Sequence, residues 1–411
     1  MSVRGNLNAK FPLFFYCQGR DTGTWKKIGL ILTGIALSGL ALFCIMPTRE
    51  QPVTGVRIGV NLDLTGPAAV YDVSTARGIT LAIDDINAAG GLLGQPVEQI
   101  VKNNESQHDL AMTQLKELSA QRVTAVLGPN ITATALAVAP LAESMHLPLI
   151  SPAGTHPDIT VSATSYHVYS YIFRATYIDS YQGRVMADFA RQTLGAKTSA
   201  VIYDAHSSYS QGLAEFYRKA FTVRGGTVPL FIGLEKKEDL VQAMALIKQQ
   251  PVDAVYAPFY GEGAEACLVA RYDEGMMMPF LGGNGWQGMR LAQHVDPAYV
   301  ENVYYADHYS YGTDLDKARD FAEKYYAAYG QWPDSYAALG YDAAMMGAAA
   351  VRQSHSNKPE AVAEALRKTV QFPGVTGTFS IDGNHDAITP VYIIHFVDGQ
   401  PALYQTIQPT T

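Results

Sequence analysis

The stretch VTAVLGPNITATALAVAPLAESM, residues 123–145, decides the fold class of this chain. Its first residues form the short apolar run of a buried strand, and the alanine-rich segment from Ile131 onward has the spacing of a helix. A Gly-Pro pair lies at the junction, with Asn130, Thr132 and Thr134 around it. The stretch therefore predicts one βα unit that places hydroxyls and backbone amides where the strand passes into the helix.

The same strand–helix unit recurs along the chain. VRIGVNL (56–62) precedes a helical segment that stops at Gly90-Gly91, and the strands SAVIYD, TVPLFIGL and VDAVYAPF each precede another. This alternation predicts an α/β fold with parallel sheets covered by helices on both faces. Because the units are too many for one ordinary sheet, we expect two doubly wound lobes. The tail, TGTFSIDGNHDA and TPVYIIHFVDGQPALYQTI, predicts antiparallel edge strands with a turn at Asp398-Gly399.

Composition excludes several classes of protein. The chain has 411 residues, 48% of them hydrophobic and 17% charged, as in a globular protein of two domains. The net charge is −8 and the basic residues are scattered, which argues against binding to nucleic acid. Cys267 is the only cysteine after the first 50 residues, so that part of the chain cannot form an internal disulfide.

An uncharged apolar segment, IGLILTGIALSGLALFCIM (28–46), follows Lys26-Lys27 and can just cross a bilayer. The lysines favour residues 1–27 as a cytoplasmic segment, or as the n-region of a signal peptide. Because ALFCIMPTRE contains no A-x-A cleavage site, an uncleaved signal anchor is favoured over a poorly marked signal peptide. We therefore expect a periplasmic or otherwise extracytoplasmic protein, anchored in the inner membrane by this helix.

The loop after the strand in 123–145 has the chemistry of an anion site. In a doubly wound sheet, ligands bind beyond the carboxyl ends of the strands, where helix N-termini present unpaired amides. Thr132 or Thr134 can add a hydroxyl there, which suits a carboxylate; the simpler interpretation is that Thr132 only caps its helix. PLISPAGTHPDIT (148–160) repeats the arrangement, and its loop should converge with the first.

Five motifs in register resemble the leucine/isoleucine/valine-binding branch of the type I periplasmic binding proteins, the substrate-binding proteins of branched-chain amino acid ABC transporters. They are TGPAAVYDVSTARGITLAIDDINAAGGLLGQPV, LGPNITATA, PLISPAGTHPDIT, YIFRATYIDSYQG and AVIYDAHSSYSQGLAEFYRKA. The resemblance covers about residues 55–407. It implies two lobes joined by a three-crossover hinge, lobe one being 55–173 plus 305–383 and lobe two 174–304 plus 384–407.

The resemblance also implies the site. The positions that hold the α-carboxylate of the ligand in the family match Thr132, Ala153 and Thr155 here. The tyrosine that covers the side-chain pocket matches Tyr71, and the tyrosine of the YGxG loop, across the cleft, matches Tyr209.

This chain departs from the family at two of those motifs. Ser210 replaces the glycine of YGxG, and Asn284 stands where the family has the acidic residue that pairs with the ligand ammonium. A neutral amide is a poor partner for a buried ammonium. Either Glu262 substitutes for the acid or the ligand lacks an ammonium. Tyr260 and Trp286 are candidates for pocket walls, with ordinary packing the alternative for each.

The sequence predicts a binding protein and not an enzyme. GNGWQG (283–288) fits G-x-G-x-x-G, but the helix behind it is too short for a dinucleotide site. We expect no cofactor and no metal. The favoured function is capture of a small polar ligand, an amino acid or related carboxylate or amide, for delivery to the permease of an ABC transporter. The alternative is a membrane-anchored sensor module that signals through a partner.

Overall fold

The structure is a computed structural model that describes residues 55–286, 288–310 and 312–409. The predicted segments 1–27 and 28–46 lie outside this range. Within the described ranges, no helix combines the length and apolar character needed to cross a bilayer.

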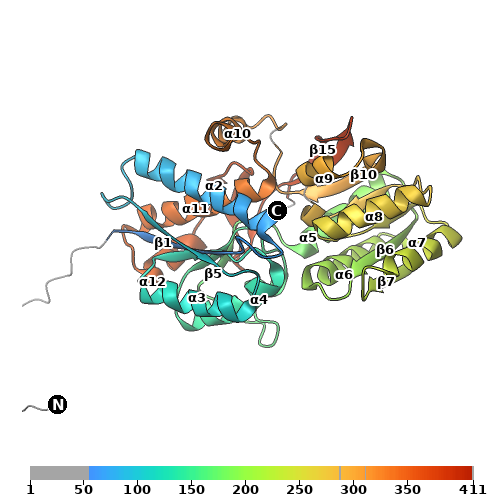
Figure 1. Cartoon of the computed structure of the whole chain (residues 1–411). Helices are drawn as coiled ribbons and strands as arrows, with labels where there is room; N and C mark the ends of the chain where they lie inside the picture. Colours follow the sequence, from blue (N-terminus) through green and yellow to red (C-terminus); the bar gives the residue numbers. More distant parts are fainter. Residues whose placement is uncertain (1–54, 287, 311, 410–411) are drawn as a thin grey trace, which may run out of the picture. The chain divides into compact units, whose positions relative to one another are not determined.

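The first sheet has five parallel strands in the order β2-β1-β3-β4-β5. Its strands are β1 (Arg57–Leu62), β2 (Glu98–Asn103), β3 (Ala125–Leu127), β4 (Leu149–Ser151) and β5 (Ile172–Arg174). The helices that cover it are α2 (Ala69–Ala88), α3 (His108–Ala120), α4 (Thr132–Ser144), α11 (Ser335–Ser354) and α12 (Pro359–Arg367). Helices α2, α11 and α12 pack on one face and α3 and α4 on the other (Figure 1). The predicted parallel, doubly covered sheet is confirmed.

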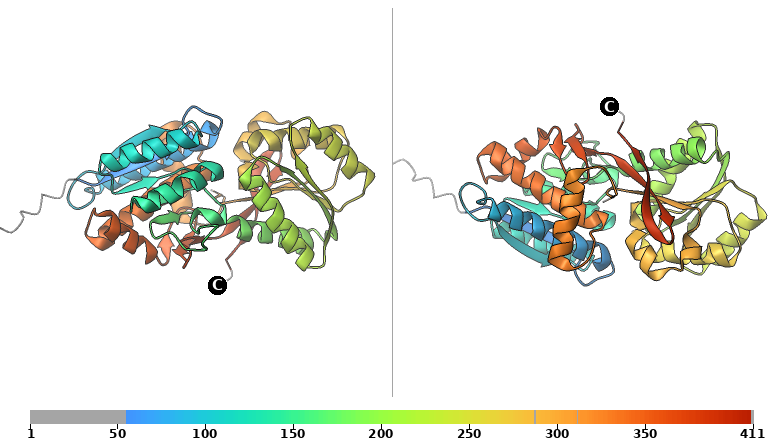
Figure 2. Two further views of the ribbon diagram at one scale, coloured as in Figure 1. Left: turned by 90° about the horizontal axis from the view of Figure 1, so that it is seen from below. Right: turned by 90° about the horizontal axis from the view of Figure 1, so that it is seen from above.

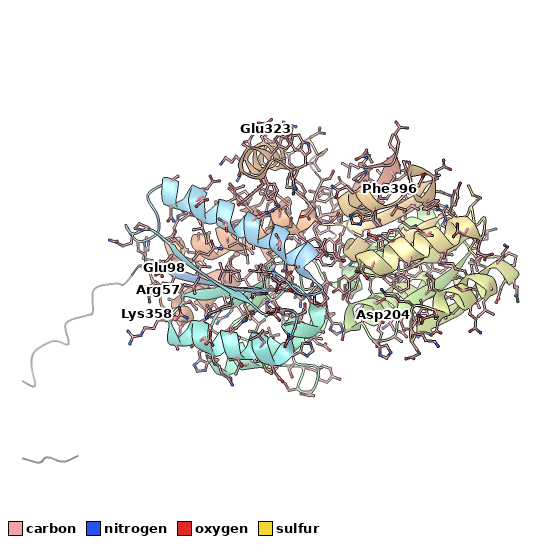
Figure 3. The ribbon with its side chains drawn as sticks, in the orientation of Figure 1. Arg57, Glu98, Asp204, Glu323, Lys358 and Phe396 are labelled. Atoms are coloured by element: carbon pink, nitrogen blue, oxygen red, sulfur yellow. The ribbon has the colours of Figure 1, made fainter. Side chains whose placement is uncertain are left out.

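The register of β1 with β2 can be followed at the amino ends of the two strands. Arg57 of β1 lies opposite Glu98 of β2, and their side chains form an ion pair with Nε and Oε2 2.8 Å apart (Figure 3). Both side chains are largely exposed, so the pair contributes little to stability. The carboxyl ends of the same strands lie at the opposite edge, which leaves that edge for the ligand loops.

The second sheet has seven strands in the order β15-β14-β10-β9-β8-β6-β7. Its strands are β6 (Thr198–Asp204), β7 (Thr227–Leu234), β8 (Ala254–Tyr256), β9 (Phe280–Gly282), β10 (Val303–Asp307), β14 (Val391–Val397) and β15 (Gln400–Ile407). Helices α5 (Asp179–Asp188) and α6 (Ser208–Val223) pack on one face. Helices α7 (Asp239–Gln249), α8 (Gly261–Asp273) and α9 (Gly288–His294) lie on the other.

The last two strands are antiparallel, as predicted (Figure 2). Strand β14 pairs with β10 and with β15, and the turn between β14 and β15 contains Asp398 and Gly399, with φ of 50° and 75°. Two successive positive φ angles are the signature of a tight hairpin turn, which explains the Asp-Gly pair there.

The chain passes between the two sheets three times. The passages follow β5, β10 and the small antiparallel sheet of β11 (Phe372–Pro373), β12 (Thr378–Ile381) and β13 (Ala387–Ile388). Helix α10 (Asp316–Tyr329) follows the second passage and packs with α11. The predicted boundaries at 304/305 and 383/384 are therefore shifted, because β10 extends the second sheet to Asp307 and β13 keeps the chain beside β12 until Ile388.

Candidate ligand-binding site

Each sheet has one point where its connections leave in opposite directions. In the first sheet β1 connects to β2 on one side while its neighbour β3 connects to β4 on the other, and in the second sheet β6 and β8 stand in the same relation. Ligands of doubly wound sheets bind in the crevice at such a point, beyond the carboxyl ends of the strands. The helix starts at these crevices carry the predicted Tyr71 and Thr132 in one lobe and Tyr209 and Tyr260 in the other.

Thr132 is the first residue of α4 and not its cap. Ile131 holds the N-cap position, and no side chain of the described residues caps this helix. Thr132 instead lies near the phenol of Tyr260 in the second lobe, where it partly opposes the rise in the pKa of Tyr260 that burial causes. Nearby, the buried hydroxyl of Thr134 has no hydrogen-bond partner among the described residues. This leaves the Thr134 hydroxyl available for a hydrogen bond at the start of α4.

The loops after β3 and β4 are fastened to each other, as predicted. Asn130 Oδ1 accepts a hydrogen bond from Ala153 N at 3.2 Å, and Ser151 Oγ donates one to the carbonyl of Pro129 at 2.6 Å. Asn130 Nδ2 in turn donates to Asp72 Oδ1 at 2.9 Å. Burial raises the pKa of Asp72 to about 7, although hydrogen bonds from Asp63 and Asn130 oppose the shift. These bonds hold the two loops in fixed positions relative to each other and to α2.

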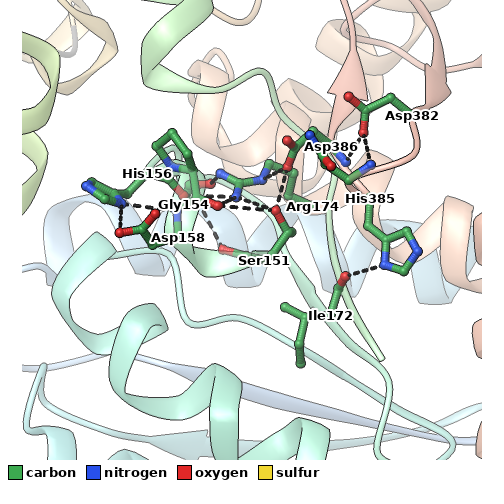
Figure 4. Close-up of polar contacts among 12 residues, drawn as sticks. Ser151, Gly154, His156, Asp158, Ile172, Arg174, Asp382, His385 and Asp386 are labelled. Atoms are coloured by element: carbon green, nitrogen blue, oxygen red, sulfur yellow. Dashed lines mark hydrogen bonds and ion pairs between the residues drawn. The ribbon is translucent and has the colours of Figure 1, made fainter. Parts of the chain in front are cut away.

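Arg174, which is fully buried, also holds the loop from residue 151 to residue 160 in place (Figure 4). Its guanidinium donates to the carbonyls of Gly154 at 2.8 Å and His156 at 2.9 Å. Its charge is balanced by Asp386, whose Oδ1 lies 2.6 Å from Arg174 Nε. Breaking a buried pair of this kind is costly, so the backbone on both sides of Thr155 is rigidly placed.

Asp179, at the start of α5, is a residue that the sequence analysis did not single out. Its backbone N–H donates to the carbonyl of Thr155 at 2.9 Å, and its side chain is fully buried. Neither carboxylate oxygen has a hydrogen-bond partner among the described residues. Burial raises the pKa of Asp179 to about 7; the nearby Thr155 hydroxyl and the Arg174 charge lower it in part. A buried carboxylate without a partner requires an explanation.

Four buried tyrosines are close enough to this carboxylate to be affected by its charge. The negative charge of Asp179 contributes to raised pKa values at Tyr177, Tyr256, Tyr209 and Tyr260, after the larger effect of burial. The hydroxyls of Tyr177 and Tyr256 are buried and, within the described residues, have no hydrogen-bond partner. Two buried phenols and a buried carboxylate thus lack hydrogen-bond partners among the described residues. Groups of this kind can fix the orientation of a small solute that carries both polar and apolar groups.

The phenols at the cleft itself are packed ring against ring. Tyr209 stacks on Tyr260 with centroids 4.6 Å apart, and its hydroxyl accepts a hydrogen bond from Gly285 N at 3.0 Å. The ring centroids of Tyr71 and Tyr336 are 4.8 Å apart; Tyr336 is a buried residue that the sequence analysis did not single out. Tyr336 follows the helix cap Asp334, and this cap is the signal that could have located it at a helix N-terminus.

A family model described as periplasmic binding protein matches residues 55–401. This chain belongs to the periplasmic binding protein family. The family comprises extracytoplasmic substrate-binding proteins and not enzymes. The resemblance stated from the sequence is confirmed.

Known members of the family match this periplasmic binding protein over most of its length. The "Leu/Ile/Val-binding protein homolog 1" of Brucella suis is 28% identical over 377 residues, 90% of this chain and 98% of that protein. The solved structure of the branched-chain amino acid transporter substrate-binding protein LivJ from Streptococcus pneumoniae, in complex with isoleucine, is 28% identical with a TM-score of 0.78. That comparison covers 87% of this chain and 99% of LivJ. The leucine-binding protein LivK from Thermotoga maritima is 29% identical, also with a TM-score of 0.78, and covers 86% of this chain and 99% of its own.

Asn284 stands where the resemblance noted in the sequence implies an acidic residue, and it begins a 3-10 turn after β9. Its backbone N–H donates to Gln182 Oε1 at 2.8 Å, and its Oδ1 accepts from Gln182 Nε2 at 3.0 Å. Both side chains are buried. The two amides thus form a neutral reciprocal pair, one helical turn along α5 from Asp179. A neutral pair supplies no charge to a ligand.

Two further candidates from the sequence are corrected by the structure. Glu262 cannot serve as a buried counter-charge, because 74% of its side chain is exposed and it forms an ion pair with Lys237 at 3.1 Å. Trp286 is fully buried in the core of the second lobe, where its Nε1 donates to the carbonyl of Ala257 at 2.7 Å. It is a packing residue, which was the alternative allowed from the sequence.

Proposed function

We propose that this protein captures a small amino acid or a related solute with an ammonium and a carboxylate, in the cleft between its two lobes, and delivers it to the permease of an ABC transporter. The observation that carries the proposal is the buried, unpartnered carboxylate of Asp179 beside Thr155. A ligand ammonium there would supply the missing opposite charge. The Leu/Ile/Val-binding relative and the isoleucine complex of LivJ support this choice of solute class.

The carboxylate of the ligand would lie on the first lobe. The hydroxyls of Thr132 and Thr155, with backbone amides of the loops after β3 and β4, are the donors expected there, and Ala153 is part of the same loop. Tyr71, Tyr209 and Tyr260 would then enclose the rest of the solute. Asn284 would position α5 through Gln182 and leave the charged contact to Asp179.

Closure of the two lobes about the three passages would bury the solute. Thr176 of the first passage and His308 of the second are joined by a hydrogen bond of 2.9 Å to Nδ1, and burial lowers the pKa of His308 to about 3. A neutral, buried contact of this kind suits a hinge whose bonds persist in both states. The solute would shift an existing balance between open and closed forms, and a scattering profile that stays the same at saturating solute would contradict closure.

The deciding experiment is mass spectrometry of the solute that co-purifies with the protein from its native host, followed by calorimetry with the identified compound. We expect one amino acid or close relative at a stoichiometry near one. Recovery of a nucleotide or a metal as the stoichiometric ligand would overturn the proposal. Capture of permease subunits by the solute-loaded protein supports delivery, whereas capture of a sensor kinase in their place would support the signalling alternative.

We further propose that residues 28–46 anchor the protein in the inner membrane with residues 55–411 outside the cytoplasm. The support is the uncharged run after two lysines and the extracytoplasmic family. The test is the mass of the mature chain together with its resistance to alkaline extraction from membranes. A chain that starts after residue 46 would contradict the anchor.

A further inference from the structure

Tyr71, in the first turn of α2, reaches across the cleft with its hydroxyl. The backbone N–H of Gly261 donates to Tyr71 Oη at 2.6 Å, and Tyr71 Oη donates to the carbonyl of Gly285 at 3.1 Å. Gly261 begins α8 and Gly285 follows β9, so the two bonds join one side chain of the first lobe to two loops of the second. Tyr71, Gly261 and Gly285 are all buried.

The two loops are those that carry ligand candidates. Tyr260 directly precedes Gly261, and Asn284 directly precedes Gly285. Gly285 also donates its N–H to the hydroxyl of Tyr209 at 3.0 Å. A single phenol thus sets the position of the three second-lobe residues that the proposed function places around the solute.

The surface above this contact is a groove shared by both lobes. It has a volume of about 550 Å³, and Tyr71 and Tyr260 lie side by side within its lining with ring centroids 5.6 Å apart. Lining residues also include Ala68 and Ile131 of the first lobe and Gly263 of the second. The Tyr71 bonds therefore lie beside this groove, where the two lobes contact each other.

We propose that Tyr71 is a positioning residue that latches the closed cleft, and that its hydroxyl acts equally on every solute. The inference rests on the proposed function. In an open cleft, water can hydrogen-bond to Gly261 N–H and Gly285 C=O. In the closed cleft both groups are buried, and without the phenol they lose these partners, which penalises closure. A latch differs from the pocket wall implied by the family resemblance, because a wall selects among solutes and a latch does not.

The test is Tyr71→Phe, which keeps the ring and removes only the hydroxyl. Two lost hydrogen bonds of ordinary strength predict that solutes dissociate roughly 5- to 150-fold faster, by one common factor, with little change in association rate. The probes are L-leucine, L-isoleucine and benzoate, measured by stopped-flow fluorescence. Tyr217→Phe is the matched control, since that buried phenol donates to Ser199 Oγ at 3.0 Å within the second lobe. We expect no change in dissociation for the control.

A second measurement does not depend on the choice of probe. In the protein as purified, amide exchange at Gly261 should be roughly 5- to 150-fold faster in Tyr71→Phe than in wild type, and unchanged in Tyr217→Phe. Equal exchange at Gly261 in wild type and Tyr71→Phe would overturn the latch, as would a change in the order of preference among the probes. Failure of all three probes to bind, with exchange altered as expected, would count against the proposed solute and support the latch.

Discussion

The two lobes meet at one cleft but contribute different chemistry to it. The first lobe offers short polar groups on loops fixed by Asn130 and Arg174, among them the hydroxyls of Thr132, Thr134 and Thr155. The second offers the large rings of Tyr209 and Tyr260, together with the Asp179 carboxylate at its edge. Under the proposed function, the first lobe orients the solute, and the second encloses it and balances its charge.

The largest expected effect comes from removing that charge. Asp179→Asn keeps the shape of the side chain but deprives a ligand ammonium of its partner, so calorimetry should show affinity reduced roughly 10²- to 10³-fold. Because the carboxylate is buried and no described residue hydrogen-bonds to it, the same variant, measured without solute, should melt roughly 2–5 °C higher at pH 8. Loss of both affinity and stability would mean that Asp179 only supports the fold.

The first lobe is tested by Thr155→Val and Thr132→Val. Hydrogen bonds to a charged group contribute about 1.5–3 kcal/mol, so each variant should raise the dissociation constant roughly 10- to 150-fold without unfolding the protein. Thr227→Val, at the exposed start of β7, is the matched control and should bind like wild type. Wild-type affinity in both cleft variants would remove the orienting role of the first lobe.

The pH dependence of binding distinguishes the role of Asp179 in the second lobe from the role of Thr155 in the first. The pKa of Asp179 is raised to about 7, so the carboxylate gains a proton as pH falls through this value and no longer attracts an ammonium. Affinity should therefore be full above about pH 8 and fall by up to tenfold per unit below pH 7. Thr155→Val should retain this slope and Asp179→Asn should lose it; a flat profile in wild type would contradict the assignment.

The smallest expected effect is at Asn284→Asp. The new carboxylate can still accept a hydrogen bond from Gln182, and it adds a second negative charge near α5. Binding of a solute with an ammonium should tighten roughly 3- to 10-fold, whereas a neutral or purely anionic solute should bind more weakly. Calorimetry with L-leucine and benzoate distinguishes the two cases, and Asn302→Asp, at an exposed turn, is the control for added charge alone.

Much of the fold could be predicted because its signals are local. Apolar runs mark β1, β3 and β6, and Gly90-Gly91 and Gly225-Gly226 follow the ends of α2 and α6. Strand β2 was not predicted, since it lies at the sheet edge and its residues are polar and mostly half-exposed. The passage boundaries were shifted for a similar reason: β10 and β13 are recognised by the strands they pair with, which the local sequence does not reveal.

The candidate site could be predicted to the extent that its residues follow the carboxyl ends of strands. Thr132 and Tyr209 lie in the first turns of helices there, and Ala153 and Thr155 lie in the loop after β4. Asp179 could not be predicted, because an acidic residue in a first helical turn is ordinary. Only tertiary packing shows that its carboxylate has no hydrogen-bond partner among the described residues. Equally, the sequence could not show that Glu262 points to Lys237 on the surface.

The division of each lobe between distant segments has a consequence for how the protein forms during synthesis. The first sheet is complete by Arg174, yet α11, which covers one of its faces, begins only at Ser335, and the Asp386 that neutralises Arg174 comes later still. Until those residues emerge, the nascent chain exposes an apolar sheet face and an uncompensated cation. The first domain to be translated is therefore among the last to finish folding, and general chaperones should be needed throughout that interval.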